Sequence, residues 1–481
     1  MTSIVTLTPA QRIGEVAARI ARDGIGPDLA DDLVARTVDV LGNCLAATRE
    51  APARIVGAVV GEWGGTAVAT AVGRPDRLPA PSAALVNGTL AHSLDFDDTH
   101  LPSVLHPSAA VVPAALAVAE RVGASGPAML AAAAVGIEVT CRLGMAGYDE
   151  ELGNSVFFER GQHATAICGA VGAAVAAGML SGLDEDGLTS VIGIAASMGS
   201  GVIEANRTGG TIKRVHCGWA AHAGVVAADL ARHGLTGPPT VIEGRFGFLQ
   251  AFCGDRVHVE RVTDGLGEDW ETLGVFVKPY PCNHFTHAGI DAALALRARG
   301  IDPASIRALT LGVPAPVLRT IAEPPEEKAH PRSGYHAAFS GPYTVAAALL
   351  GGGGLGVFHE DFTDAAAADP ARLALAARVR CVADDESTAI FPRQFPAVLT
   401  AELADGSTVT ERVRENRGGP QRPLSDAEAS AKFTGNAARA LVPGAAEELV
   451  AAAWSLREGG RSVADVLARL RDPQLFLSAE Q

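Results

Sequence analysis

The chain has 481 residues, 48% of them hydrophobic and 19% charged, which is typical of a soluble globular protein with more than one domain. Its formal net charge of −15 argues against nucleic acid and against a membrane surface as partners. The seven cysteines are dispersed, which predicts reduced thiols in a cytoplasmic protein and offers no cage for zinc or an iron–sulfur cluster. We therefore expect no metal and no cofactor.

Apolar periodicity and alanine-rich runs predict a large helical domain in the first half of the chain. We expect helices at 8–47, 81–91, 107–121, 125–144, 163–182 and 184–203, and a further alanine-rich helix after Gly218 within 206–233, and find no clear pattern at 55–71. Residues 164–183 lack charge, as a membrane span does. They are mostly alanine and glycine, however, which suits close packing of helices in a soluble core.

The pattern changes after Val275. Alternating apolar residues predict strands at 305–314 and 375–383, and the turn at 404–406 predicts a hairpin over 395–413. With a helix at 343–350, this segment forms an α+β domain.

A capping box from Ser425 to Glu428 opens a further helical segment, which we expect to return to the first domain. The predicted fold class is mainly α with a second, smaller α+β domain. The predicted boundaries are 1–273 for the helical domain, 274–416 for the α+β domain and 417–481 for the C-terminal return.

A short proline-rich stretch, residues 277–287, concentrates groups that carry chemistry. It contains Lys278, His284 and His287, and its prolines exclude an ordinary helix until about Thr286. The chain has only four lysines, and lysine is the cation whose pKa burial can move. The stretch is either a shaped loop with acid/base groups or a connector whose histidines face solvent. Two histidines and Cys282 without a fourth ligand do not make a zinc site.

Two further clusters have both a functional and a structural interpretation. Lys213 and Arg214, with His216, follow a Gly/Thr-rich loop, and this basic group either holds two carboxylates or forms a surface patch. His163 precedes an alanine-rich helix and is either a catalyst or a capping or core histidine.

The acidic loop 95–106 offers carboxylates and histidines that either bind a metal or cap helices and pair with arginines. The residues concerned are Asp95, Asp97, Asp98, His100 and His106. Residues 351–356 satisfy G-x-G-x-x-G but follow a helix, so we do not expect a dinucleotide site. Taken together, the clusters suit proton transfer next to a carboxylate: loss of water, decarboxylation or epimerisation.

Five motifs in order resemble the MmgE/PrpD family. They are Leu94-Asp95-Phe96-Asp97-Asp98-Thr99-His100, His106-Pro107-Ser108, the run from Lys213 to Ala221, Lys278-Pro279-Tyr280-Pro281-Cys282, and Pro423-Leu424-Ser425. That family includes 2-methylcitrate dehydratases, cis-aconitate decarboxylases and iminodisuccinate epimerases. The resemblance implies a cofactor-free enzyme for small di- or tricarboxylic acids, with a helical domain built from both chain ends, an α+β lid and a homodimeric state.

The resemblance also assigns roles to residues. His106, His163, Lys213, Lys278 and Tyr343 are predicted to be catalytic, with a histidine as base, Tyr343 or a lysine as acid, and the two lysines as an anion site. The predicted substrate-binding residues are Asp95, Thr99, Arg214, His216, His284 and His287.

Asn283 occupies the place where the decarboxylases have a histidine. The main prediction is therefore a hydro-lyase similar to 2-methylcitrate dehydratase. A decarboxylase or an epimerase in the same pocket, or a carboxylate-binding protein without catalysis, are the alternatives.

Overall fold

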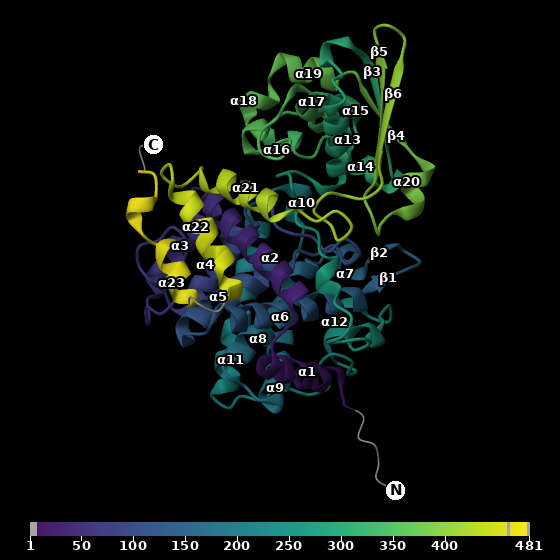
Figure 1. Cartoon of the computed structure of the whole chain (residues 1–481). Helices are drawn as coiled ribbons and strands as arrows, with labels where there is room; N and C mark the ends of the chain where they lie inside the picture. The colour runs from purple at the N-terminus through teal and green to yellow at the C-terminus, as the bar shows by residue number, and fades with distance from the viewer. Residues whose placement is uncertain (1–6, 459–461, 479–481) are drawn as a thin grey trace. The chain divides into compact units, whose positions relative to one another are not determined.

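The computed structural model describes residues 7–458 and 462–478, and the chain divides into two compact units (Figure 1). Unit 1 combines Met1–Val275 with Phe433–Gln481, and unit 2 comprises Phe276–Lys432. Unit 1 is mainly helical and unit 2 is α+β, so the predicted fold class is confirmed.

The second boundary falls inside helix α21 (Asp426–Ala437), later than the expected 416/417. The segment just after residue 416 is tied to the start of unit 2, since the Val277 N–H donates to the Gly418 carbonyl at 2.9 Å.

Unit 1 is a bundle of alanine-rich helices. In chain order they are α1 (Pro9–Asp23), α2 (Pro27–Ala46), α3 (Ala51–Trp63), α4 (Ala80–His92), α5 (Ser108–Val122), α6 (Gly126–Ala146), α7 (Val156–Glu159), α8 (Ala164–Leu180), α9 (Glu185–Ala196), α10 (Ala205–Thr208), the 3-10 turn η1 (Ile212–Val215), α11 (His216–Arg232) and α12 (Phe248–Cys253). The chain returns with the end of α21, α22 (Ala445–Trp454) and α23 (Val463–Arg469), and α22 packs on α2 (Figure 1). Two-residue strands β1 (Tyr148–Asp149) and β2 (Asn154–Ser155) depart from the all-helical expectation.

Glycines at one helix crossing bring two elements of the site together. A Cβ on Gly88 of α4 would lie 2.7 Å from the Cα of Gly218 on α11, and a Cβ on Gly218 would lie 2.2 Å from the Leu85 carbonyl oxygen. Because neither position has room for a side chain, the two backbones approach closely. The crossing therefore holds the end of α4, at His92, near the start of α11, at His216.

Unit 2 is built on a sheet with strand order β4-β3-β5-β6. The strands are β3 (Ile306–Val313), β4 (Val379–Ala383), β5 (Ala397–Leu403) and β6 (Thr408–Val413). Strand β3 is parallel to β4 and antiparallel to β5, and β5 and β6 form the predicted hairpin. Helix α13 (His287–Ala298) packs on α17 (Gly341–Leu350) and on β5 and β6. The shorter helices are α14 (Leu318–Ile321), α15 (Pro325–Ala329), α16 (Gly334–Ala337), α18 (Asp364–Ala367), α19 (Pro370–Ala376) and α20 (Asp385–Ile390).

Helix α3 forms where the sequence showed no clear pattern. Two local expectations were wrong. Helix α9 ends at Ala196, before the expected 203, because the chain next passes so close to α8 that a Cβ on Gly199 would lie 2.7 Å from the Ile167 carbonyl oxygen. The strand expected from residue 375 starts at Val379, because Pro370 opens helix α19 through Ala376.

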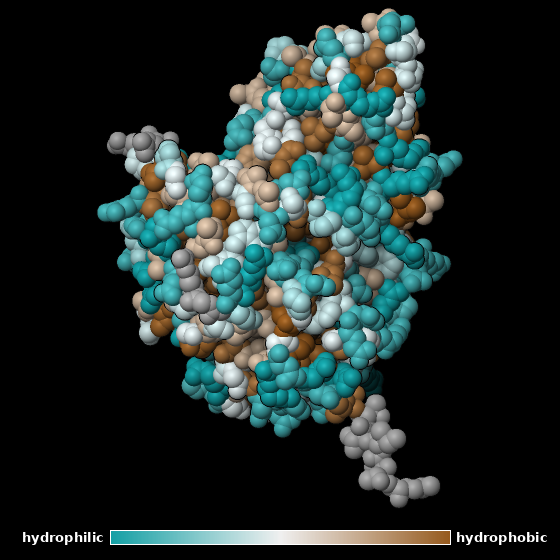
Figure 2. Space-filling view, in the orientation of Figure 1, coloured by the Kyte–Doolittle hydropathy of each residue, from teal (hydrophilic) through white to brown (hydrophobic). Residues whose placement is uncertain are grey.

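One helix of the described residues, α6, is long and apolar enough to cross a membrane by length and composition. Of its most apolar window, 89% is buried inside the protein, as in the core helix of a soluble bundle. On the face shown in Figure 2, hydrophilic and hydrophobic residues are interspersed.

Because α4 and α11 cross so closely, we predict that one methyl group added at Gly218 lowers the stability of the fold. We expect Gly218→Ala to destabilise the fold by about 1–3 kcal/mol, because the new Cβ must displace backbone. Gly61→Ala, on the exposed face of α3, is the matched control and is expected to stabilise by about 0.5–1 kcal/mol. Urea-induced unfolding measures both, and an unchanged midpoint for Gly218→Ala would contradict the close crossing.

Candidate active site

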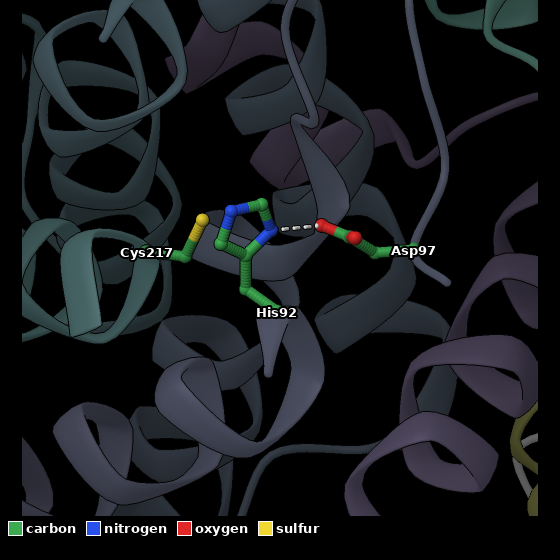
Figure 3. A group of neighbouring side chains, drawn as sticks. All are labelled: His92, Asp97 and Cys217. Atoms are coloured by element: carbon green, nitrogen blue, oxygen red, sulfur yellow. Dashed lines mark hydrogen bonds and ion pairs between the residues drawn. The ribbon is translucent and has the colours of Figure 1, made fainter. Parts of the chain in front are cut away.

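The site is a cluster of four imidazoles in unit 1, beginning where α4 ends. His92, the last residue of α4, and Asp97, in the loop that follows, form a hydrogen-bonded pair with 2.7 Å between Nδ1 and Oδ2 (Figure 3). Both side chains are buried. Between them, Asp95 has a positive φ of 52°, a conformation that aspartate tolerates better than most residues and that turns the loop back on itself.

His106 is held by the same loop. Its Nδ1 lies 2.6 Å from the Asp98 carbonyl oxygen and 3.3 Å from the Thr99 hydroxyl, and its backbone N–H donates to Thr165. Because a carbonyl oxygen only accepts, Nδ1 carries a proton. The nitrogen that gains or loses the second proton is Nε2, which lies 3.9 Å from Oδ1 of Asp95.

His163 and His216 form the other half of the cluster. His163 precedes α8, His216 begins α11, and their Nδ1 atoms lie 3.0 Å apart. Burial lowers the pKa of His163 well below its usual value, and the positive charge of Lys213 and the neighbouring histidines add to this. Burial, with His92 and Lys213, lowers the pKa of His216 to about 4. Both rings are therefore neutral near pH 7 and can accept a proton.

The four rings are contiguous. Their centroids are 5.2 Å apart for His92 and His106, 5.6 Å for His92 and His163, and 5.0 Å for His163 and His216. Lys213 lies in η1, directly before α11, and places a positive charge close enough to act on both His163 and His216. A cluster of imidazoles beside a lysine can bind an anion and exchange protons with it.

A buried ion pair fixes the loop that carries the cluster. Arg36 of α2 lies 3.2 Å from Asp98 and also donates to the carbonyls of Thr272 and Val275. Asp98 accepts from the hydroxyl of Ser108, the first residue of α5. Burial raises the pKa of Asp98 to about 6, although Arg36 and Ser108 act in the opposite direction.

Among the residues that the structure describes, two sets of side chains have donor atoms close enough together for a metal ion: His92, Asp97 and Cys217, and Asp95, Asp97 and His106. The first set is shown in Figure 3, with the His92 ring between Cys217 and Asp97. We assign no metal to either set. The Asp97 carboxylate already pairs with His92, and burial raises the pKa of the Cys217 thiol, which disfavours the thiolate that metals bind.

The predicted site residues that lie in unit 1 are Asp95, Thr99, His106, His163, Lys213, Arg214 and His216, and all but Arg214 belong to this cluster. Arg214 is half-buried, with its guanidinium 3.5 Å from Glu50. His92, Asp97 and Cys217 also belong to the cluster. The sequence analysis named Asp97 only as a possible metal ligand or helix cap, and it did not place His92 or Cys217 in the site. The pairing of His92 with Asp97, five positions later, follows neither helical nor strand periodicity, so the sequence pattern does not reveal it.

The other predicted site residues lie in unit 2. Lys278 is 2% exposed, and its role stays a prediction. His284 and His287 are buried with their ring centroids 4.5 Å apart, and Nε2 of His287 lies 3.2 Å from the Cys282 carbonyl oxygen. His284 also packs edge-on against Phe276 and Phe395. Their role as substrate ligands stays a prediction.

Tyr343 lies in the core of unit 2, and its predicted role as an acid stays a prediction. Its ring belongs to the core of unit 2, and its hydroxyl donates to the Asp361 carbonyl at 2.7 Å and accepts from Arg372 at 3.1 Å. Burial raises the pKa of this hydroxyl, so it holds its proton more firmly than a free tyrosine does.

Comparison with known proteins agrees with the motifs. The sequence matches the MmgE/PrpD N-terminal domain over residues 11–260 and the MmgE/PrpD C-terminal domain over residues 280–457. The chain belongs to the MmgE/PrpD family.

Similar members of the MmgE/PrpD family include a cis-aconitate decarboxylase of Homo sapiens, 31% identical over 79% of this chain and 78% of its own. A cis-aconitate decarboxylase-like protein of Aspergillus oryzae is 30% identical over 75% of this chain and 76% of its own. The cis-aconitate decarboxylase of Aspergillus terreus is 32% identical over a shorter region, 47% of this chain and 48% of its own.

The environment of Asp98 predicts a pH dependence of stability. The folded state keeps the Asp98 proton up to about pH 6, whereas an unfolded aspartate loses it near pH 3.9. Relative to Asp98→Asn, the free energy of unfolding of the wild type should therefore fall as pH rises from about 4 to about 6, by up to about 3 kcal/mol. Urea unfolding across this range measures the difference, and parallel pH profiles would contradict the assignment.

Proposed function

We propose that the protein is a lyase for a small di- or tricarboxylic acid, and that decarboxylation of a substrate similar to cis-aconitate is its reaction. The observation that carries this proposal is the buried cluster of His106, His163 and His216 beside Lys213, with two histidines held neutral near pH 7. The relatives named cis-aconitate decarboxylase that match about three quarters of the chain support the choice of reaction.

The cluster has the groups that this chemistry requires. The cation of Lys213 attracts a substrate carboxylate and orients it. When the carbon–carbon bond to a second carboxylate breaks, CO2 leaves and the electron pair stays on carbon, so a proton must be delivered there. The substrate's negative charge favours the protonated form of the neighbouring imidazoles, which can then act as that donor.

A second candidate is dehydration of a hydroxy acid such as 2-methylcitrate. In this reaction a neutral histidine removes a proton from the carbon next to a carboxylate, and a protonated group assists the departure of hydroxide as water. Asn283 favours this candidate, because its amide cannot exchange a proton as a histidine does. Its side-chain oxygen accepts from the Phe285 N–H and caps the turn before α13.

Proton NMR of the metal-stripped protein with a panel of acids tests the proposal. The panel contains cis-aconitate, citrate, 2-methylcitrate and iminodisuccinate. Loss of CO2 from cis-aconitate supports decarboxylation, and a new alkene from a hydroxy acid supports the second candidate. Saturable binding without turnover of any acid would instead indicate a carboxylate-binding protein and contradict the lyase proposal.

Substitutions then test the site on the substrate that is turned over. We expect His106→Gln and His163→Asn each to lower kcat by about 10²–10⁴-fold, the usual contribution of an acid/base group. His233→Gln is the control, because His233 is exposed just beyond the far end of α11. Wild-type turnover in both test variants would contradict the assignment of the site.

A further inference from the structure

The His92–Asp97 pair lies at the centre of the imidazole cluster, yet the proposed reaction gives it no step. The His92 ring is 5.2 Å from that of His106 and 5.6 Å from that of His163. Among the contacts of the described residues, His92 and His163 each have two ring neighbours in the cluster, and His92 is the ring that contacts both His106 of the acidic loop and His163 before α8. The position of His92 therefore affects both halves of the cluster.

Asp97 fixes His92 in one tautomer and one orientation. A carboxylate accepts and does not donate when it is ionised, so the proton of the 2.7 Å hydrogen bond resides on Nδ1 of His92. The two side chains are 1% and 0% exposed, so water does not compete for this bond. The opposite side of the ring faces Cys217, as Figure 3 shows.

The charged and titratable groups around His92 come from four elements. They are Asp95, Asp97, Asp98 and His106 in the acidic loop, His163 before α8, Lys213 in η1, and His216 and Cys217 in α11. The nearest carboxylate is Asp97. His92 is one of the neighbouring groups that lower the pKa of His163 and His216.

We infer that His92, anchored by Asp97, is a positioning residue that holds the rings of His106 and His163 in place and sets the protonation state of His163 and His216. Its effect on rate rests on the proposed function. Its effect on the two histidines is a property of the protein without substrate.

The test uses two neutral replacements, His92→Asn and His92→Gln. The asparagine amide can still donate to Asp97 from about the position of Nδ1, whereas the glutamine amide extends past it. The full-length protein is labelled with carbon-13 at Cε1 of histidine, and the resonances of His163 and His216 are followed by NMR as pH is varied. In both variants we expect the two histidines to take up protons at higher pH than in the wild type.

Measurements of kcat and KM distinguish a positioning role of His92 from a loss of structure in the variants. On the substrate identified by the panel, we expect His92→Gln to lower kcat by up to about 10²-fold with KM nearly unchanged, as for a displaced catalytic group. His92→Asn should retain more activity than His92→Gln, and the acidic limb of its pH–kcat profile should move to higher pH.

His100→Asn is the matched control. His100 is as buried as His92, 2% exposed, and also meets a carboxylate, with Nε2 3.3 Å from Glu271. The largest causes of the lowered pKa of His163 and His216 are burial, Lys213 and neighbouring histidines other than His100, so we expect their titrations to be unchanged in this variant.

Unchanged titrations of His163 and His216 in both His92 variants would overturn the inference. An inactive wild type on every acid of the panel, with the expected titration shifts still present, would instead overturn the proposed function and leave the electrostatic role of His92 intact. The two failures are therefore distinguishable.

Discussion

The site depends on imidazoles that are buried beside a lysine. Removal from water disfavours the charged form of His163 and His216, and Lys213 and His92 act in the same direction. The result is a pair of proton acceptors at neutral pH. Under the proposed function, a bound polycarboxylate supplies negative charge that favours protonation of this cluster, so binding of the acid and uptake of a proton favour each other.

The bundle of unit 1 provides the rigid frame for this arrangement. The glycine crossing between α4 and α11 brings His92 and His216 together, and the ion pair of Arg36 with Asp98 fixes the loop that carries His106. The glycine crossing and the ion pair both lie within the helical core, where close packing leaves little freedom for backbone shifts. The groups proposed to be catalytic therefore lie in loops and at helix ends, while buried contacts determine their positions.

Much of this could be predicted from sequence. The helix pattern and the hairpin at 404–406 gave both domains, the motifs led to His106, Lys213 and His216, and the family resemblance led to His163. Contacts between residues far apart in the chain could not be predicted. Arg214 meets Glu50, which is 164 positions away, and the Tyr343 hydroxyl is held by Asp361 and Arg372. His92 was missed because its pairing depends on the left-handed turn at Asp95, which periodicity does not reveal.

The central claim is that the imidazole cluster of unit 1 binds a polycarboxylate and takes up a proton with it. The most direct measurement follows the Cε1 resonances of His163 and His216 at constant pH near 7 as tricarballylate, a saturated tricarboxylate, is added. We expect both resonances to move toward the imidazolium position in a saturable manner, while that of His233 stays unchanged. Saturable binding that leaves the resonances of His163 and His216 in place would contradict the account.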